Sequence, residues 1–470
     1  MKSIRKPPYE SSKVSYKPSG IEWLGEIPQS WEIVKIKQVS KVVTGKTPCL
    51  ENEWGNEMPF ITPTDCFLDT KYTSLSQRKL SKIGIKNYNS IIIPQDSILV
   101  TCIASIGKVV MSNKEVITNQ QINSVIPNTD LISPNFAFYV LLVTMPFAEN
   151  YFCGYSILPI LNKSEFSNIK IPLPPLQEQK AIAEFLDKKC DKISQFIESK
   201  QKLITLLQEK KQALINECVT KGLNCYTKHN VESRPLRGAQ KEKDSRQYKN
   251  SGVEYLGTIP KHWEVRRLAS FGKFSKGGNI GRNDLLDEGI STLIYGDIYT
   301  KYEIKTHTLH SKVSQETAKN ATPIYKGDIL FSGSGETKED IGKNIVYLGD
   351  EKAFAGGDVI IFRQNQNDAL FLSYALNTQG VRFCKLIESK GEIIVHIYAS
   401  NLRDIKIPLP PLQEQKAIAS YLDTQITKID LAIEKTKQQI TYIKEYKTSL
   451  INQAVCGRIQ QNKRGENATR

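Results

Sequence analysis

The sequence lacks the features that mark membrane, metal-binding and disulfide-bonded proteins. No stretch approaches the roughly 18 apolar residues that a membrane span needs. Five histidines, and nine cysteines without a C-x-x-C pair, favour neither a metal site nor a disulfide scaffold. The opening MKSIRKPPYESSK is charged and polar, which predicts no signal peptide. These absences favour a cytoplasmic protein with no membrane partner.

Motifs of catalysis are missing as well. Residues 40–47 resemble a phosphate-binding loop, but Ser40 replaces its first glycine and Pro48 stands where the following helix should run. Residues 6–9 read Lys-Pro-Pro-Tyr, with lysine where an adenine methyltransferase has an amide or a carboxylate. We find no Ser/His/Asp order, no H-E-x-x-H and no convincing carboxylate pair. The sequence therefore predicts no catalytic residue, no metal ligand and no cofactor bound by this chain.

Acidic residues are too few to balance the basic ones, and the net charge is +15. The excess lies mainly in segments that look flexible: residues 1–18 carry +4, residues 224–250 carry +4 and residues 455–470 carry +3. Basic tails attract phosphates without sequence preference. The regions between them are nearly neutral, so a DNA-binding surface there requires charge gathered into a patch.

What the sequence does contain is one segment of fifteen residues that occurs twice. Residues 169–183 and 405–419 both read IKIPLPPLQEQKAIA, and all fifteen positions match at an offset of 236 residues. The prolines fix φ and lack N–H donors, so the strand-like IKI should end there and a helix should begin near Pro175. A repeat of this length indicates a duplication rather than a solenoid.

Each copy runs into a long helical pattern, which we predict over about 176–220 and 412–456. Apolar residues recur at spacings of four and three, the pattern of a coiled-coil seam. The seam residues are Leu186, Ile193, Ile197, Ile204, Leu207 and Leu214, then Leu422, Ile429, Ile433, Ile440, Ile443 and Leu450. Two seams at the same place in two repeats predict helices that pack on each other; two independent core helices are the alternative. A helix of about 43 residues is about 65 Å long, the length of a spacer.

The regions before the helices share a plan but not a surface. They open with SGIEWLGEIPQSW from Ser19 and SGVEYLGTIPKHW from Ser251. In the first region, 91–93 and 98–100 read as strand–turn–strand, and 136–143 as a short helix. Each region contains a strand followed by a Ser/Gly loop that ends in Ile-Gly-Lys. The predicted segments are a flexible basic arm (1–18), a first head (19–170), a first spacer helix (171–222), a linker (223–250), a second head (251–406), a second spacer helix (407–456) and a basic tail (457–470).

The doubled IPLPPLQEQKAIA, with the two related openings, resembles the specificity subunit of type I restriction-modification enzymes. The resemblance implies an α+β fold in which two target-recognition domains are separated by two long antiparallel coiled-coil helices, with a pseudo-twofold internal repeat. It implies that each domain reads one half of a split double-stranded DNA target. The helices would set the spacing and bind methylation subunits, two in number, and restriction subunits would join through that complex. The partner subunits would then bind S-adenosylmethionine, ATP and Mg, and this chain would not be an enzyme.

Side-chain chemistry suggests which residues contact DNA. Asn and Gln pair with adenine, Arg and Lys with guanine, and Ser or Thr with either. The candidates in the first head are Ser105, Lys108, Asn119, Gln120, Gln121 and Asn123; those in the second are Ser332, Ser334, Lys338, Lys343, Arg363 and Lys390. Arg363 and Lys390 are expected at phosphates. The alternative is that residues 119–121 cap a turn and that the Gly-rich loop is only a hairpin.

Three functions remain open at this level. The first is a non-catalytic subunit that reads an asymmetric, two-part DNA site, since identical heads in a twofold frame would read a palindrome. The second is a stand-alone methyltransferase or nuclease with fused recognition domains, which should bind S-adenosylmethionine or cut DNA alone. The third is a coiled-coil scaffold without affinity for DNA.

Overall fold

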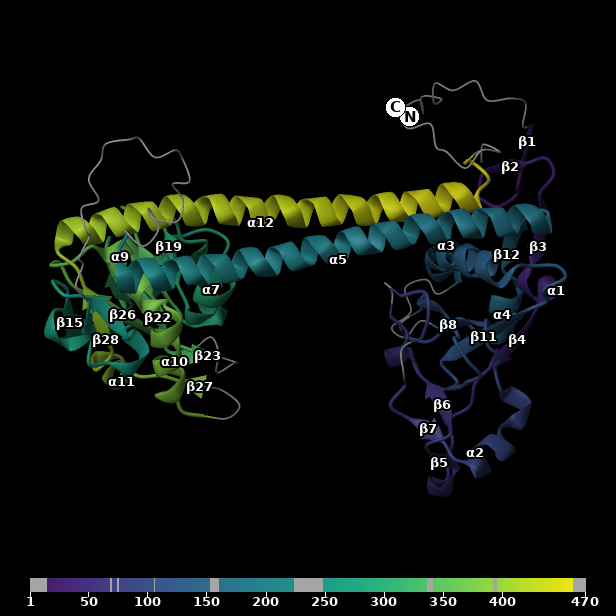
Figure 1. Cartoon of the computed structure of the whole chain (residues 1–470), viewed down its shortest axis with the longest axis horizontal. Coiled ribbons are helices and arrows are strands. Elements are labelled where there is room, and N and C mark those ends of the chain that lie inside the picture. The colour runs from purple at the N-terminus through teal and green to yellow at the C-terminus, as the bar shows by residue number, and fades with distance from the viewer. Residues whose placement is uncertain are drawn as a thin grey trace, which may run out of the picture. The chain divides into compact units, whose positions relative to one another are not determined.

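A computed structural model describes residues 15–67, 70–73, 76–104, 106–152, 160–223, 248–335, 341–391 and 395–459. The chain divides into two compact units, one formed by residues 1–199 with 438–470 and the other by residues 200–437. Each unit combines a mixed α/β head with parts of the same two long helices (Figure 1). We call the head of unit 1, residues 16–173, head 1, and the head of unit 2, residues 248–409, head 2.

Head 1 is built on two four-stranded sheets. The antiparallel sheet β4-β11-β8-β9 consists of β4 (Ser40–Thr44), β11 (Ile122–Pro127), β8 (Ile98–Thr101) and β9 (Val109–Met111). The mixed sheet β10-β6-β7-β5 consists of β10 (Ile117–Thr118), β6 (Met58–Ile61), β7 (Lys79–Leu80) and β5 (Trp54–Gly55). The turns and helices of head 1 are α1 (Ile36–Val39), η1 (Glu51–Glu53), η2 (Pro63–Asp65), α2 (Lys82–Asn87), η3 (Asn89–Ile91), α3 (Pro134–Phe152) and α4 (Lys163–Asn168).

Head 2 repeats this plan with larger sheets. One sheet has the order β16-β26-β22-β24-β19, from β16 (Lys273–Lys276), β26 (Val359–Arg363), β22 (Ile329–Ser332), β24 (Asn344–Tyr347) and β19 (Lys305–Thr306). The other has the order β17-β20-β18-β25-β21, from β17 (Leu285–Leu286), β20 (Ser311–Val313), β18 (Ile290–Leu293), β25 (Ala353–Ala355) and β21 (Thr322–Ile324). Its turns and helices are η4 (Glu254–Leu256), η5 (Leu268–Ser270), η6 (Arg282–Asp284), α7 (Tyr295–Thr300), α8 (Gln315–Lys319), α9 (Ala369–Leu376), α10 (Gln379–Ile387) and α11 (Ala399–Arg403). The mixed α+β class is confirmed.

Both heads start with the same two-stranded ribbon. In head 1, β1 (Tyr16–Pro18) pairs antiparallel with β2 (Glu26–Pro28); in head 2, β13 (Tyr248–Asn250) pairs in the same register with β14 (Thr258–Pro260). A second ribbon joins the opening of each head to its end, through β3 (Glu32–Lys35) with β12 (Lys170–Leu173) and β15 (Glu264–Arg267) with β28 (Lys406–Leu409). A third, β23 (Ser334–Gly335) with β27 (Val395–His396), belongs to head 2. The segments expected as flexible arm and linker thus each contain a strand.

The long helices are α5 (Leu176–Lys221) and α12 (Leu412–Val455), close to the expected ranges. The second glutamine of each repeated motif fixes the start of its helix, because the side chain is buried. Gln179 Nε2 donates to Pro174 O at 2.8 Å while its Oε1 accepts from Ser133 N at 2.8 Å. Gln415 repeats this, with Nε2 to Pro410 O at 2.8 Å and Oε1 accepting from Asp368 N at 2.9 Å. The repeated sequence therefore ties the start of each helix to its own head.

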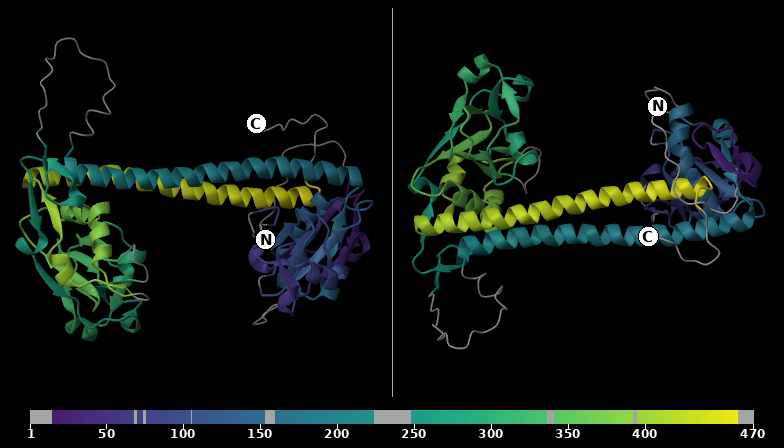
Figure 2. Two further views of the ribbon diagram at one scale, coloured as in Figure 1. Left: turned by 60° about the horizontal axis from the view of Figure 1, so that its bottom comes forward. Right: turned by 90° about the horizontal axis from the view of Figure 1, so that it is seen from above.

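Each unit packs the early part of one helix against the late part of the other (Figures 1 and 2). In unit 1, the seam residues Leu186, Ile193 and Leu450 are buried in the core, with Ile197 and Ile443 packed against it. In unit 2, Leu214, Leu422, Ile429 and Ile433 are buried, with Ile204 and Leu207 packed against them. Ile440 is half-buried. The reading of these helices as independent core elements is disfavoured, because seam residues of both share one core in each unit.

Glycine ends each long helix beside a buried tryptophan. Gly457 has φ +69° and a Cβ there would lie 3.1 Å from Trp31 Cη2; Gly222 has φ +76° and a Cβ there would lie 3.4 Å from Trp263 Cζ2. A positive φ after a helix is the usual place for glycine. The related openings of the two heads, which contain Trp31 and Trp263, therefore pack against the ends of the long helices.

Two local expectations were wrong, and a third was right in type but too short. Residues 91–93 do not form a strand, because Ile91 ends the turn η3 and Ile93 makes only an isolated bridge with Val116. The helix expected at 136–143 is confirmed but is longer than expected, since α3 begins at Pro134 and has 19 residues. The strand of the repeated motif does not stop before Pro172, which pairs in register with Ile33. A two-stranded ribbon has free outer edges, so it accommodates a residue without an N–H. No helix among the described residues is long and apolar enough to cross a membrane.

Candidate nucleic-acid interface

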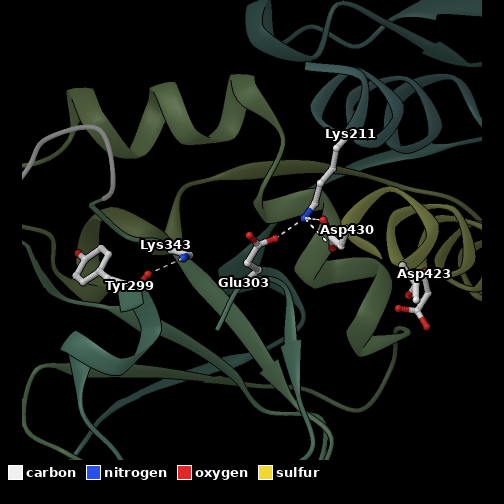
Figure 3. Close-up of polar contacts among 7 residues, drawn as sticks. Lys211, Tyr299, Glu303, Lys343, Asp423 and Asp430 are labelled. Carbon is white, nitrogen blue, oxygen red and sulfur yellow. Dashed lines mark hydrogen bonds and ion pairs between the residues drawn. The ribbon is translucent and has the colours of Figure 1, made fainter. Parts of the chain in front are cut away.

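The two predicted Ser/Gly loops leave equivalent strands and return to equivalent lysines. In head 1, Thr101 N donates to Lys108 O at 3.0 Å; in head 2, Ser332 N donates to Lys343 O at 2.9 Å. Each lysine also donates from Nζ to the carbonyl of a helical turn. Lys108 donates to Pro63 O at 3.1 Å. Lys343 donates to Tyr299 O at 3.2 Å, as Figure 3 shows. The Ile-Gly-Lys correspondence seen in the sequence is therefore a structural one.

Glycine precedes both lysines because the backbone requires it. Gly107 has φ +91° and Gly342 has φ +67°. In this region of positive φ, the backbone of a residue with a side chain is strained. The buried residue beneath each glycine differs: it is Met145 in head 1 and Lys385 in head 2. The two loops thus share the backbone conformation at this glycine, but a different buried side chain lies beneath each.

Between these fixed ends the loops diverge. Six residues, 102–107, join the ends in head 1, and ten residues, 333–342, join them in head 2. In head 1, Ile103 bridges Ile160, whose side chain is half exposed. In head 2, the corresponding edge is the ribbon β23–β27, which pairs Ser334 with His396. The edge is therefore apolar in head 1 and polar in head 2.

The serines of the second loop turn inward. Ser332 Oγ donates to Ser334 O at 2.7 Å, and Ser334 Oγ lies 2.9 Å from His396 Nδ1. Tyr299 Oη donates to the same Ser334 O at 2.7 Å. Both serines are buried, which argues against direct base contact by either and for a role in holding the edge. Sequence reasoning missed Tyr299 and His396 because they arrive from distant segments.

Lys385 was also missed, although it lies directly beneath the second loop. Its Nζ donates to Gly342 O at 2.7 Å, Leu376 O at 2.9 Å and Asn344 Oδ1 at 3.1 Å. The side chain is completely buried, and this burial holds the pKa of its ammonium well below the ordinary value. Three acceptors match the three N–H groups of an ammonium, so the lysine ties the loop to the end of α9.

The expected phosphate contact Arg363 is already engaged. Its Nε and Nη2 bond both oxygens of the buried Asp328 at 2.8 and 2.7 Å, and its guanidinium lies 4.4 Å from the centre of the Tyr325 ring. The hydrogen bond with Asp328 raises the pKa of Arg363 further. This bidentate pair indicates a structural role. Lys390 is exposed, and its backbone exchanges hydrogen bonds with His396 at the edge of β27.

The polar run of head 1 follows the turn-capping alternative in part. Asn119 is buried and bonds Gln121 twice, from Nδ2 to Oε1 at 2.9 Å and from Gln121 N to Oδ1 at 3.1 Å. Asn123 is buried in β11, where its Oδ1 accepts from Thr44 Oγ1 at 2.6 Å. Gln120 is exposed and accepts from Thr47 Oγ1 at 2.5 Å. Ser105 and Lys338 lie outside the described residues.

A charged cleft of about 600 Å³ lies between head 2 and the two helices within unit 2. Lys211 of α5 bonds Asp430 of α12 at 2.7 Å and also pairs with Glu303 of head 2 (Figure 3). Lys211 occupies a seam position, and an ion pair there gives the seam a polar register point. Among the described residues, no group of three or more His, Cys, Asp or Glu is placed to hold a metal ion.

These features define a duplicated α+β protein in which one frame carries two different edges, one apolar and one polar, the class of a two-headed recognition protein. The sequence model described as "Type I restriction modification DNA specificity domain" matches residues 28–208 and 260–442. The chain therefore belongs to the type I restriction-modification DNA specificity family, and the resemblance drawn from the repeated motif is confirmed.

Known relatives match nearly the whole chain. The type I restriction enzyme MjaIX specificity subunit of Methanocaldococcus jannaschii is 24% identical over 93% of this chain and 95% of its own length. The MjaVIII specificity subunit of the same organism is 26% identical over 92% and 94%. A solved chain described under "complex assembly and conformational transition of the type I R-M system" has a TM-score of 0.67 at 16% identity, covering 92% of this chain and 99% of that chain. The last likeness concerns the fold.

Proposed function

We propose that this DNA specificity subunit reads an asymmetric two-part DNA site, one half with each head. One observation carries the asymmetry: the strand ends that position the two loops are equivalent, yet six residues join them in head 1 and ten in head 2. Their edges carry Ile103 and Ile160 in one head and Ser334 and His396 in the other. An apolar edge favours the thymine methyl, whereas the His396 imidazole can form hydrogen bonds, so two such edges select different bases.

The helices serve this function as a spacer and a docking frame. We propose that α5 and α12 form an antiparallel coiled coil that relates the two heads by a pseudo-twofold axis. The shared cores of seam residues in each unit and the repeated glutamine contacts support this arrangement. A pair of helices with two equivalent surfaces can bind the same partner twice. We therefore propose two methylation subunits on the helices, with restriction subunits joining through them.

The chain itself contributes recognition and not chemistry. In this proposal, the partner subunits bind S-adenosylmethionine, ATP and Mg. The best-placed serine hydroxyls, those of Ser332 and Ser334, are buried and bonded within the loop frame, which supports a positioning role. The competing proposal, a stand-alone methyltransferase or nuclease, requires the purified chain to bind S-adenosylmethionine or to cut DNA.

Co-expression with the methylation subunits of the same genome, followed by modification mapping of host DNA, tests the function. We expect a split motif with two different halves and methylation in both, lost when this gene is deleted. A palindromic or uninterrupted motif would contradict the asymmetric reading. No DNA binding by the assembled complex would leave the scaffold explanation. As a matched control, the purified chain without partners should neither methylate nor cut the same DNA.

A further inference from the structure

In unit 1, a lysine and a tyrosine of head 1 meet one aspartate of the long helix. Lys71 Nζ lies 2.5 Å from Asp187 Oδ1, and Tyr139 Oη donates to the same oxygen at 2.6 Å. Asp187 is on α5, Tyr139 is on α3, and Lys71 precedes Tyr72, which bridges Met111 of β9 in parallel. We call Lys71, Tyr139 and Asp187 clamp 1.

Unit 2 contains the same three residue types in the same places. Lys305 Nζ lies 2.5 Å from Asp423 Oδ1, and the Tyr374 phenol lies near enough to Asp423 for the carboxylate to add to burial in raising the pKa of the tyrosine. Asp423 is on α12, Tyr374 is on α9, and Lys305 starts β19, which pairs in parallel with β24. We call Lys305, Tyr374 and Asp423 clamp 2; Asp423 is drawn beside the Lys211 pair in Figure 3.

The two clamps are equivalent in position and in environment. Asp187 and Asp423 stand at the offset of the exact repeat, 236 residues. The side chains of the ion pairs are about equally accessible, 21% and 31% exposed in clamp 1 against 31% and 32% in clamp 2. Burial, followed by the contact with the aspartate, raises the pKa of both tyrosines, so each phenol stays a hydrogen-bond donor at neutral pH. Two heads with different reading loops thus share the same polar joint.

Such a joint fixes direction where apolar packing does not. The hydrophobic effect is non-directional, whereas hydrogen bonds and short ion pairs restrict angles. A head of about 150 residues has a radius of gyration of roughly 15 Å. A rotation of about 15° moves a point at that distance by roughly 4 Å, slightly more than the ~3.4 Å rise of one base pair. Loss of a small angular restraint is therefore enough to change which spacer length fits.

We propose that clamp 1 and clamp 2 are positioning sites that hold each head at a set angle on its helix and thereby restrict the spacer length accepted between the two half-sites. The proposal rests on the proposed function, because it needs a split target. The clamp residues do not read bases. Their loss should relax the spacer requirement and leave the half-site sequences unchanged.

The test uses the full chain in complex with the methylation subunits of the same genome. Duplexes carry the mapped half-sites with the natural spacer, one base pair fewer or one more, and relative methylation rates are measured. In Asp187→Asn and in Asp423→Asn, discrimination between the natural and altered spacers should fall about tenfold, the contribution of one hydrogen bond. Base preference within each half-site should stay as in the wild type.

Matched variants separate positioning from general damage. Lys305→Arg should keep the spacer discrimination that Lys305→Met loses, because arginine restores the charged donor. Glu184→Gln is the control, since Glu184 lies on α5 one turn from Asp187 but pairs with Lys188, and both side chains are about 70% exposed. It should behave as the wild type. Where an aspartate variant fails to fold, Tyr139→Phe and Tyr374→Phe remove one hydroxyl each and should relax the spacer in the same direction.

The outcomes distinguish this inference from the function beneath it. A wild-type complex that reads no split site would contradict the proposed function. A wild-type complex with a strict spacer, and clamp variants that are equally strict, would overturn the positioning role alone. Altered base preference with an unchanged spacer would overturn it as well, because the residues would then act on reading and not on angle.

Discussion

Replacing Lys385 with methionine probes how the second reading loop is held. Methionine preserves the length and apolar stem of the side chain and removes its N–H donors. The carbonyls of Gly342 and Leu376 and the side-chain oxygen of Asn344 then lose a partner in a fully buried site. Each unsatisfied acceptor costs about 1–3 kcal/mol, and relief of the buried ammonium offsets part of this. We expect a net loss of about 2–4 kcal/mol in the free energy of unfolding.

The pH dependence of this loss has a definite sign. Burial holds the pKa of Lys385 well below its ordinary value in the folded chain, and unfolding restores that ordinary value. Between these two values the unfolded chain binds a proton that the folded chain does not, so the stability of the wild type rises with pH. The slope reaches at most about 1.4 kcal/mol per pH unit. The cost of Lys385→Met should therefore be larger at pH 9 than at pH 7.

Urea unfolding at both pH values measures these differences, and hydrogen–deuterium exchange locates them. Exchange should rise in β22, β24 and α9, which the lysine joins. Lys326→Met is the control, since Lys326 pairs with the exposed Asp350 and should change stability by about 0.5 kcal/mol or less. An unchanged or higher stability of Lys385→Met would refute the reasoning, because the ammonium would then be a net burden. A cost that falls with pH would refute the direction of the pKa shift.

Four further predictions concern the frame and the reading surface. Gly457→Ala should cost about 1–3 kcal/mol by thermal unfolding, and Gly252→Ala, with a similar φ but open space, about 1 kcal/mol; equal costs would exclude the steric part. Arg363→Lys should lower stability by about 1–3 kcal/mol and leave the salt dependence of DNA binding unchanged. Lys390→Ala should reduce that dependence by about one phosphate contact in a salt titration, and no change would place Lys390 away from DNA. Seven residues added to α5 and to α12 lengthen each by about 10 Å, so methylation mapping should show a spacer about three base pairs longer with the same bases; changed bases with the old spacer would contradict a ruler.

Residue chemistry alone does not tell which of the candidate DNA contacts are accessible in the folded chain. Asn123, Ser332 and Arg363 have the right groups for bases or phosphates, but the first two are buried and the third is paired with Asp328. Strand alternation and ion-pair geometry decide this, and neither is visible in a polar run. By contrast, Asp187 and Asp423 were readable as identical residues at the repeat offset. They went unnoticed because they fall outside the apolar seam.

The sequence by itself determined the duplication, the two long helices and the related openings of the heads. These depend on local rules, namely proline before the helix start, heptad spacing and a repeat at a constant offset. Only the tertiary structure decided that Lys385 supports the second loop, that His396 faces Ser334, and that a lysine and a tyrosine of each head meet one aspartate of its helix. These residues are brought together from distant segments by sheet order and packing. The free energy of such contacts depends on burial and angle, which the order of residues along the chain does not specify.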